Sequence, residues 1–429
     1  MTPRHMILTT TALCVWGVAA LAQTAAPTTD AAPAEAVAAA TPAADQTAEQ
    51  TTGTVAAAAL AASPDADLRN AAAEQFEPIP RMAELPSGAP MTREKIELGT
   101  MLFFDPRMSS SGVFSCQSCH NIGMGGVDAL ETSIGHGWQA GPRNSPTMLN
   151  AVFNAAQFWD GRAEDLAEQA KGPVQAGVEM ANTPDHLIAT LKSMPGYVEA
   201  FEASFPGEAD PVTFDNFAHA IETFEATLLT PNSRFDQWLL GTDGAMNDQE
   251  KRGLQAFMDN GCAGCHAGVN FGGQDYYPFG LVDAPDSNIR PEGDTGRFAL
   301  TNTDEDHYVF RAAPLRNVAI TTPYFHSGKV WSLEEAVKVM SNAQLGTELT
   351  EEQAKDITAF LHTLTGEQPQ VVHPTLPERT EATPHPQPMD EPAKVEGAAA
   401  DATPPAADQP AAADPAAQAA DAAAAPASN

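Results

Sequence analysis

Two short motifs, each a pair of cysteines followed directly by histidine, constrain this chain more than any other feature of its sequence. They read Cys-Gln-Ser-Cys-His at 116–120 and Cys-Ala-Gly-Cys-His at 262–266. Two thiols on one helical turn can add to the two vinyl groups of a haem, and the adjacent imidazole can then bind the iron. Each motif therefore predicts one covalently attached haem c. The residues that would bind the two haems are Cys116, Cys119, His120, Cys262, Cys265 and His266.

Two other interpretations of paired cysteines fit this pattern less well. A redox-active dithiol has no need of a histidine at the same position in both motifs. Zinc ribbons usually place their cysteine pairs about 15–20 residues apart, whereas 142 residues lie between Cys119 and Cys262. A fifth cysteine, Cys14, stands alone near the N-terminus. The haem interpretation is therefore preferred for both motifs.

The residues between about 80 and 373 carry the signals of helices separated by loops rich in Gly and Pro. Thr213 is a candidate N-cap, and an apolar stripe with helical spacing follows it at Phe214, Phe217, Ile221, Phe224 and Leu228. Two capping boxes are recognised, at Ser332 with Glu335 and at Thr350 with Gln353. No convincing alternating strand series accompanies them. The predicted fold class is all-α, with two cytochrome c-like haem domains and long loops, over 80–230 and 231–373.

The charge of the chain excludes some functions and favours others. Lys and Arg total 22 against 56 Asp and Glu, which gives a formal net charge of −34. Binding to nucleic acid needs clustered positive charge, so we expect no nucleic-acid partner. The middle of the chain is itself acidic, and such a surface can steer a partner that presents a basic face.

Both ends of the chain differ in composition from its middle. Residues 1–22 combine Arg4 with an apolar stretch at 7–21 and small residues before a possible cleavage after Ala22, which predicts a signal peptide and a periplasmic location. A membrane anchor is the alternative, although the stretch is short for a span. Residues 23–79 and 374–429 are rich in Ala, Pro and acidic residues and poor in large apolar side chains. We expect both segments to be disordered because they cannot offset the entropy of ordering.

Spacing alone does not identify the second axial ligand of either iron. A His/Met-ligated haem suits electron transfer, whereas an open or displaceable position allows peroxide to bind. Histidine and methionine side chains of the folded region are all possible ligands. The candidates are Met101, Met124, His136, Met148, Met180, His326 and Met340.

The sequence around both motifs resembles the bacterial di-haem cytochrome c peroxidases. The resemblance lies in residues 116–147, 150–180 and 315–328 and includes Gly-Pro-Arg-Asn-Ser-Pro, Phe-Trp-Asp-Gly-Arg and Thr-Thr-Pro-Tyr-Phe-His-Ser-Gly. It spans about residues 80–370. It implies reduction of hydrogen peroxide to water at the N-terminal haem. Electrons would enter at the C-terminal haem from a small periplasmic cytochrome c or a copper protein, and a homodimer is expected.

The same resemblance implies roles for individual residues. His136 corresponds to the distal ligand that blocks the peroxidatic iron in the fully oxidised enzyme, and Met340 to the ligand of the electron-entry haem. Trp159 corresponds to the tryptophan between the haems. The pair that handles peroxide corresponds to Glu179 and Gln169. A calcium ion would be bound by Asn144 and by the backbone carbonyls of Thr321 and Pro323.

These assignments have a chemical rationale. Breaking the O–O bond of peroxide requires a proton to move from the inner to the outer oxygen, and a carboxylate such as Glu179 can carry it as base and then acid. Apolar neighbours at 173–178 suit a raised pKa for that carboxyl. Gly135 and Gly137 flank His136 and would let its backbone swing between a bound and a released position.

Three rival functions are kept. One is a non-catalytic di-haem electron carrier. Another is a di-haem enzyme that oxidises tryptophans of a second protein, in which a tyrosine occupies the position of Met340. The last is an envelope scaffold built on the Ala/Pro-rich tails.

Overall fold

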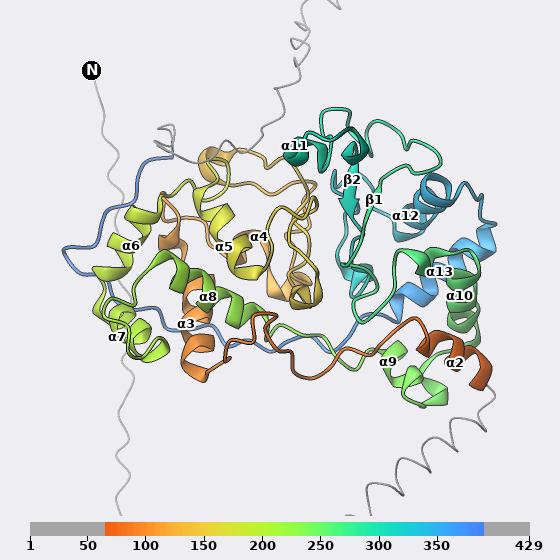
Figure 1. The fold of residues 1–429 in the computed structure, drawn as a ribbon, viewed down its shortest axis with the longest axis horizontal. Helices are drawn as coiled ribbons and strands as arrows, with labels where there is room; N and C mark the ends of the chain where they lie inside the picture. The colour runs from red at the N-terminus through yellow and green to blue at the C-terminus, as the bar shows by residue number, and fades with distance from the viewer. Residues whose placement is uncertain (1–64, 390–429) are drawn as a thin grey trace, which may run out of the picture. The chain divides into compact units, whose positions relative to one another are not determined.

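The structure is a computed structural model that describes residues 65–389 (Figure 1). The signal peptide expected at 1–22, Cys14 and most of both tails lie outside the described residues, so these predictions stay untested. Within 65–389, no helix combines the length and the apolar character that a membrane span requires.

The N-terminal lobe is built from helices that pack around α8. Its helices are α3 (Arg93–Phe104), α4 (Cys116–Cys119), α5 (Leu166–Gln175), α6 (Pro184–Lys192), α7 (Pro195–Ser204) and α8 (Phe214–Glu225). Thr213 caps α8 by accepting a hydrogen bond from the N–H of Asn216. The predicted stripe is confirmed except at its first residue, because Phe217, Ile221, Phe224 and Leu228 are buried while Phe214 is only partly buried.

The C-terminal lobe repeats this helical pattern and adds a small sheet. Its elements are α9 (Arg234–Leu239), α10 (Asp248–Asp259), β1 (Tyr276–Pro278), α11 (Phe298–Thr301), β2 (Val309–Arg311), α12 (Leu333–Met340), a π-helical turn (Ser341–Leu345) and α13 (Glu351–His362). The capping box at Thr350 and Gln353 is confirmed. At Ser332 only half of the predicted box forms, because the hydroxyl accepts from the N–H of Glu335 without a return bond.

The prediction of an all-α fold is wrong in one detail. Strands β1 and β2 pair antiparallel, with Tyr276 opposite Arg311. Each strand has three residues, which is too short to show an alternating pattern in the sequence. Short 3₁₀ turns occur at Pro106–Met108, Ile122–Met124, His136–Trp138, Ala151–Phe153, Asp243–Ala245, Cys262–Gly264, Asp304–Asp306 and Val318–Ile320.

One helix crossing is repeated in both lobes. A Cβ added at Gly99 of α3 would lie 1.9 Å from the carbonyl oxygen of Ala220 in α8. A Cβ added at Gly253 of α10 would likewise lie 1.9 Å from the carbonyl oxygen of Asp356 in α13. Each pair of helices therefore crosses backbone against backbone, and only glycine fits at the crossing. Each lobe thus pairs the helix before its motif with a helix after it.

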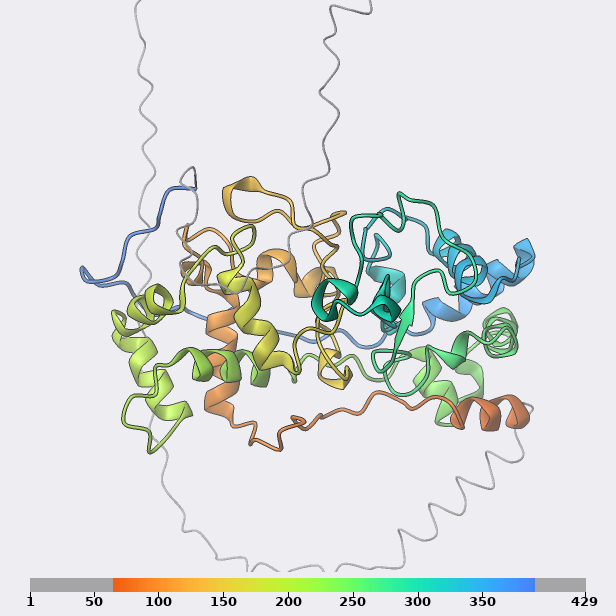
Figure 2. The same ribbon diagram turned by 45° about the horizontal axis from the view of Figure 1, so that its top comes forward.

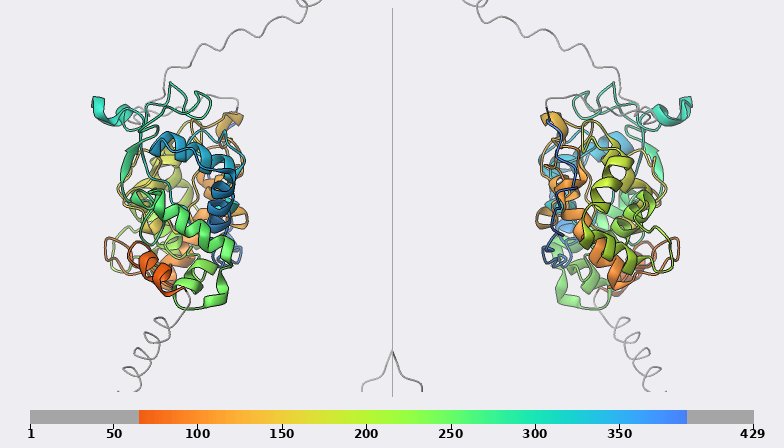
Figure 3. Two further views of the ribbon diagram at one scale, coloured as in Figure 1. Left: turned by 90° about the vertical axis from the view of Figure 1, so that its right-hand side faces the viewer. Right: turned by 90° about the vertical axis from the view of Figure 1, so that its left-hand side faces the viewer.

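The disorder expected for 23–79 is corrected for residues 65–79. Helix α2 (Ala66–Ala73) lies beside α9 in the C-terminal lobe, where Figure 3 shows it in red-orange. Ala72 and Phe76 are buried in the core of that lobe, and Phe76 stacks on Phe271 with ring centroids 4.2 Å apart. These apolar residues provide the buried surface that the rest of the Ala-rich segment lacks.

The disorder expected for 374–429 is likewise corrected for residues 374–389. After α13 the chain runs back to the N-terminal lobe, as the blue segment in Figures 1 and 2 shows. The carbonyl of Pro377 accepts a 2.8 Å hydrogen bond from Arg107 Nη1, and the hydroxyl of Thr380 donates to the carbonyl of Ser193. Thr383 is buried in this contact. Each end of the folded chain therefore packs on the lobe that is farther from it in sequence.

Candidate haem and peroxide site

Both cysteine motifs line a single cavity of about 770 Å³. The cavity is bounded by α4, α5 and α8 on the N-terminal side and by α12 and the segment after α10 on the C-terminal side. All six predicted haem-binding residues line it. The two motifs, 146 residues apart in the sequence, therefore open into one shared space.

The first motif is held in a helical turn. The N–H of Ser115 donates to the hydroxyl of Ser118, the N–H of Ser118 donates to the carbonyl of Ser115, and the N–H of His120 donates to the carbonyl of Cys116. Burial raises the pKa of Cys119 to about 11 and lowers the pKa of His120. The imidazole is therefore neutral near pH 7, as an iron ligand must be.

The second motif follows α10 after a sharp turn. Gly261 has φ +87°, a left-handed conformation that ends the helix just before Cys262. His266 is buried, and its Nδ1 lies 3.3 Å from the carbonyl oxygen of Phe271. Nδ1–H donates in this bond, so Nε2 is left with a free lone pair for a metal. Burial also lowers the pKa of His266.

These residues fit two covalently bound haems. None of the four cysteines in the described residues forms a disulfide, and all four line the cavity. Arg311 is 5% exposed, and its Nε and Nη1 have no hydrogen-bond partner within residues 65–389. Burial lowers the pKa of Arg311 to about 10, so the group is still a cation at neutral pH. A buried, unpartnered guanidinium on the cavity wall suits a carboxylate such as a haem propionate.

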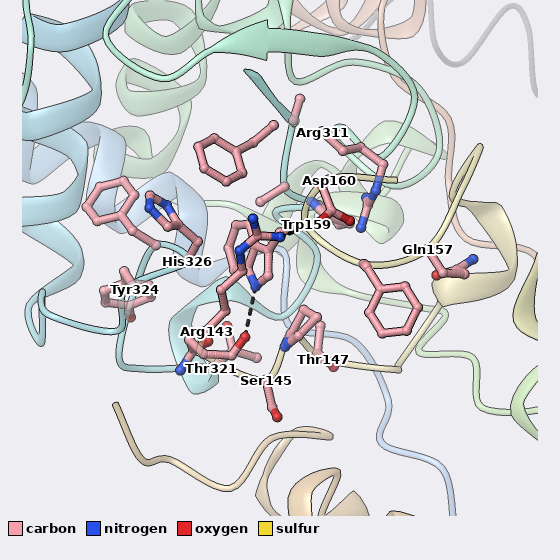
Figure 4. Close-up of a pocket in the computed structure, with 18 of the residues that line it drawn as sticks. Arg143, Ser145, Thr147, Gln157, Trp159, Asp160, Arg311, Thr321, Tyr324 and His326 are labelled. Atoms are coloured by element: carbon pink, nitrogen blue, oxygen red, sulfur yellow. Dashed lines mark hydrogen bonds and ion pairs between the residues drawn. The ribbon is translucent and has the colours of Figure 1, made fainter. Parts of the chain in front are cut away.

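Trp159 lies in the part of the cavity that both lobes share (Figure 4). Its indole Nε1 donates a 2.8 Å hydrogen bond to the carbonyl of Asn144, and its own carbonyl accepts from the N–H of Arg311. The ring of His326 packs edge-on, with centroids 6.2 Å apart. These contacts from both lobes fix the orientation of the indole.

A buried ionic network surrounds the tryptophan. Arg143 pairs with Asp160 at 2.6 Å and with Asp294 at 2.6 Å, and the three side chains are mostly buried. Burial lowers the pKa of His326 to about 4, so this histidine is neutral at pH 7. Arg143, Asp160, Asp294 and Arg311 were not among the residues predicted from the sequence. Their role was not visible because only the tertiary fold buries them.

Glu179 and Gln169 both line the cavity on the side of the first motif. Gln169 projects from α5, and Glu179 follows the turn that ends this helix, where its N–H donates to the carbonyl of Ala176. The structure thus brings the predicted peroxide pair to the cavity that contains Cys116 and Cys119. The raised pKa expected for Glu179 stays a prediction.

His136 is placed differently from the other predicted site residues. It is 3% exposed and lies in a 3₁₀ turn, but it does not line the cavity, whereas its neighbour Gly135 does. Its N–H donates a 2.8 Å hydrogen bond to the carbonyl of Glu179. A Cβ at Gly135 would lie 2.2 Å from the carbonyl oxygen of Val178. Glycine is therefore required at 135 because a larger residue would not fit against the Glu179 segment. This packing role is separate from the backbone flexibility predicted for Gly135.

Most of the remaining predicted residues line the cavity, but two candidate axial ligands do not: Met101 packs against the core of the N-terminal lobe, and Met124 is exposed. Met340 is the last residue of α12, directly before the π-helical turn. Met148, Met180 and His326 line the cavity as well, so lining alone does not single out one axial ligand. The predicted calcium ligands Asn144, Thr321 and Pro323 also lie on its wall.

Comparisons with known proteins agree with this architecture. Residues 93–244 match the family model described as di-haem cytochrome c peroxidase, and residues 250–365 match that of cytochrome c. The chain is 59% identical over 319 residues to cytochrome c551 peroxidase of Pseudomonas aeruginosa, an alignment that covers 74% of this chain and 92% of the relative. This chain belongs to the di-haem cytochrome c peroxidase family.

Two further similarities place the chain within that family. It is 34% identical to methylamine utilization protein MauG of Methylorubrum extorquens, over 76% of this chain and 92% of the relative. A crystal structure of a MauG-like protein associated with microbial copper homeostasis superposes with a TM-score of 0.60 at 28% identity, covering 67% of this chain and 93% of that one. As a di-haem cytochrome c peroxidase, the chain has two cytochrome c-type domains and binds two haem c groups.

Proposed function

We propose that this chain reduces hydrogen peroxide to water at the N-terminal haem, with electrons that enter at the C-terminal haem. The observation that carries the proposal is the single cavity that is lined by both motifs and by Glu179, Gln169 and Met340. When bound, the two haems supply the electron-accepting and electron-donating iron centres. The roles that follow belong to the residues of the chain.

Glu179 moves the proton that peroxide cleavage needs. Its carboxylate takes a proton from the inner oxygen of the substrate and returns it to the outer oxygen, which leaves as water. The amide of Gln169 holds the substrate or the departing water by a hydrogen bond. Trp159 fills the space shared by both lobes with an aromatic ring and so forms part of the electron path.

His136 is proposed as the displaceable group that closes the peroxide site before reduction. Its position outside the cavity is the one expected of the released histidine. Its hydrogen bond to the carbonyl of Glu179 ties the position of this loop to that of the acid–base residue. Met340 is proposed as the permanent ligand at the electron-entry site, and a methionine there argues against the tryptophan-oxidising enzymes.

Calcium is proposed at the wall formed by Asn144, Thr321 and Pro323. Carbonyl and amide oxygens are the hard donors that Ca²⁺ prefers. Ca²⁺ takes about 6–8 oxygen ligands, so waters would complete the site. The carbonyl of Asn144 accepts from Trp159, which would link the ion to the indole between the lobes.

The setting of the enzyme is also a proposal. The residue composition at 1–22 supports export to the periplasm. The formal net charge of −34 supports a small cytochrome c or copper protein with a basic face as the electron donor. A homodimer is proposed from the family resemblance alone.

The decisive experiment is peroxide turnover by the full-length holoenzyme with a reduced cytochrome c as donor. Glu179→Gln should lower kcat by about 10²–10⁴-fold, the usual contribution of a general acid–base group. Glu168→Gln is the matched control, because Glu168 lies on α5 outside the cavity and pairs with Lys171. Equal activity of the two variants would refute the assignment. Absence of turnover in the wild type after one-electron reduction would instead favour the electron carrier.

A further inference from the structure

A second carboxyl group, that of Glu225, is buried, lines the cavity and has no role in the proposed peroxide chemistry. Glu225 is the last residue of α8 and is 5% exposed. We propose that Glu225 is a redox-linked proton site of the N-terminal haem, which binds a proton from solvent when that haem gains an electron and releases it on oxidation. This inference rests on the haem at Cys116 and Cys119, and not on peroxide turnover.

The fold aims this side chain at the cavity. Ile221 and Glu225 are one helical turn apart on α8, and both line the cavity. Cys116 packs against the core clusters that contain Ile221 and Phe224, the α8 residues beside Glu225. Burial, followed by the charge of Glu225, raises the pKa of the Cys116 thiol, in agreement with this proximity. Within residues 65–389, the carboxylate of Glu225 has no hydrogen bond or ion pair. A buried carboxyl group without a protein partner is costly unless another group or a proton compensates its charge.

Glu222 shows that this arrangement is specific to Glu225. It is three residues earlier on the same helix and is equally buried, at 2% exposed. Its carboxylate lies 3.2 Å from Nδ1 of His219, and it does not line the cavity. Helix α8 therefore has two buried glutamates. Glu222 is paired with His219, and Glu225 faces the cavity of the haem site.

The surrounding charges leave Glu225 uncompensated. The groups that act on Cys116 are Glu225, Glu179 and Cys119, none of which is a cation. The titratable side chains of the helices packed against α8 are Arg93, Glu94, Lys95 and Glu97 on α3, Glu168 and Lys171 on α5, and Asp185, His186 and Lys192 on α6. None of these lines the cavity. The Lys and Arg side chains among them have partners elsewhere: Arg93 bonds to Glu97, Lys171 to Asp215 and Lys192 to Asp210, and Lys95 lies over the ring of Phe205.

The protonation equilibrium of Glu225 falls in a useful range. Burial, followed by the charge of Glu222, raises its pKa to about 8. An electron added to the neighbouring haem removes one positive charge and so favours the protonated carboxyl group. Oxidation restores that charge and favours release of the proton. One electron and one proton move in the same direction at each step, so charge in the buried cavity stays balanced.

The test is a redox titration of the N-terminal haem in the full-length holoenzyme between pH 6 and 9. One proton per electron corresponds to a tenfold change per pH unit, or about 59 mV. The midpoint potential of the wild type should fall with pH at a slope that approaches this limit. Glu225→Gln should remove most of the slope, and the matched control Glu222→Gln should retain it. An unchanged slope in Glu225→Gln would overturn the proposal.

Infrared difference spectra of the reduced and oxidised wild type provide a readout that needs no variant. A protonated carboxyl band should appear on reduction and should be absent in Glu225→Gln but present in Glu179→Gln. A spectrum without any carboxyl change on reduction would overturn the proposal even if Glu225→Gln fails to fold. Neither measurement uses peroxide, so the result is independent of the proposed peroxidase activity.

Discussion

Replacing Gly135 by alanine should destabilise the protein and lower its activity, because an added methyl group would collide with the segment that carries Glu179. The added Cβ would lie 2.2 Å from the carbonyl oxygen of Val178 and 2.7 Å from Cα of Glu179. Ordinary contact requires about 3.5 Å, so the two segments must separate by about 1 Å. The φ of Gly135 is −123°, which is not the left-handed region that favours glycine, so the predicted cost is that of the contact.

The magnitude follows from these distances. Overpacking of this kind costs about 1–3 kcal/mol. Weakening the hydrogen bond from His136 to Glu179 adds about 1 kcal/mol. For a lobe of this size each kcal/mol corresponds to roughly 2–4 °C in Tm. A displacement of about 1 Å at the segment that carries Glu179 should also lower kcat, by up to about 10²-fold.

The assay compares Gly135→Ala with Gly177→Ala, both as full-length holoenzyme. Gly177 lies in the same segment as Glu179, but a Cβ there would meet no atom within 4 Å. Thermal unfolding and peroxide turnover are measured for both variants and the wild type. We expect a lower Tm and lower kcat for Gly135→Ala only. The reasoning is refuted if the two variants behave alike in both measurements.

Three further predictions concern the charges and the folded ends. Burial raises the pKa of Asp294, but bonding to Arg143 outweighs it and holds the pKa below the ordinary 3.8. The carboxylate therefore stabilises the fold above pH 4, and this stability is lost as the pH falls further. In acid unfolding, Asp294→Asn should lose less free energy of unfolding than the wild type over that pH range. Asp236→Ala removes the 2.7 Å ion pair of Arg316, whose side chain is 1% exposed. It should lower the free energy of unfolding, measured with denaturant, by about 3–5 kcal/mol. The control Glu97→Ala breaks the exposed pair with Arg93 and should lower it by less than about 1 kcal/mol. A chain that stops after residue 373 lacks the contact between Thr380 and Ser193. Amide hydrogen exchange around Ser193 should be faster than in the full chain, whereas exchange in α13 should be unchanged. Equal exchange around Ser193 in the two chains would contradict this contact.

The parts of the fold that were predictable are those with local causes. Both haem motifs and the caps at Thr213 and Thr350 depend on neighbouring residues, and the structure agrees with them. The order of residues 65–79 was missed because large apolar residues are few in this Ala-rich segment, and Phe271, the partner of Phe76, is far away in the sequence. The two strands were missed because a strand of three residues is too short to show an alternating pattern of apolar and polar residues.

The candidate site was predictable to a similar degree. Residues with a family motif, such as Trp159 and Glu179, were recognised, and the structure places them on the cavity wall. Arg311 and Glu225 carried no signal, because a charged residue looks the same in the sequence whether solvent or a cofactor cavity faces it. The position of His136 outside the cavity could not be foreseen either, because no local pattern shows whether a loop histidine faces a cavity.

The glycine crossings of the two lobes explain why the chain shows a structural repeat without a readable sequence repeat. Where two helices meet through their main-chain atoms, the close approach depends on Gly99 or Gly253 and less on the side chains around the contact. Substitutions elsewhere on these helices can then accumulate without moving the scaffold. The two lobes can therefore diverge in sequence and still keep the same helix crossing, as long as each retains its glycine.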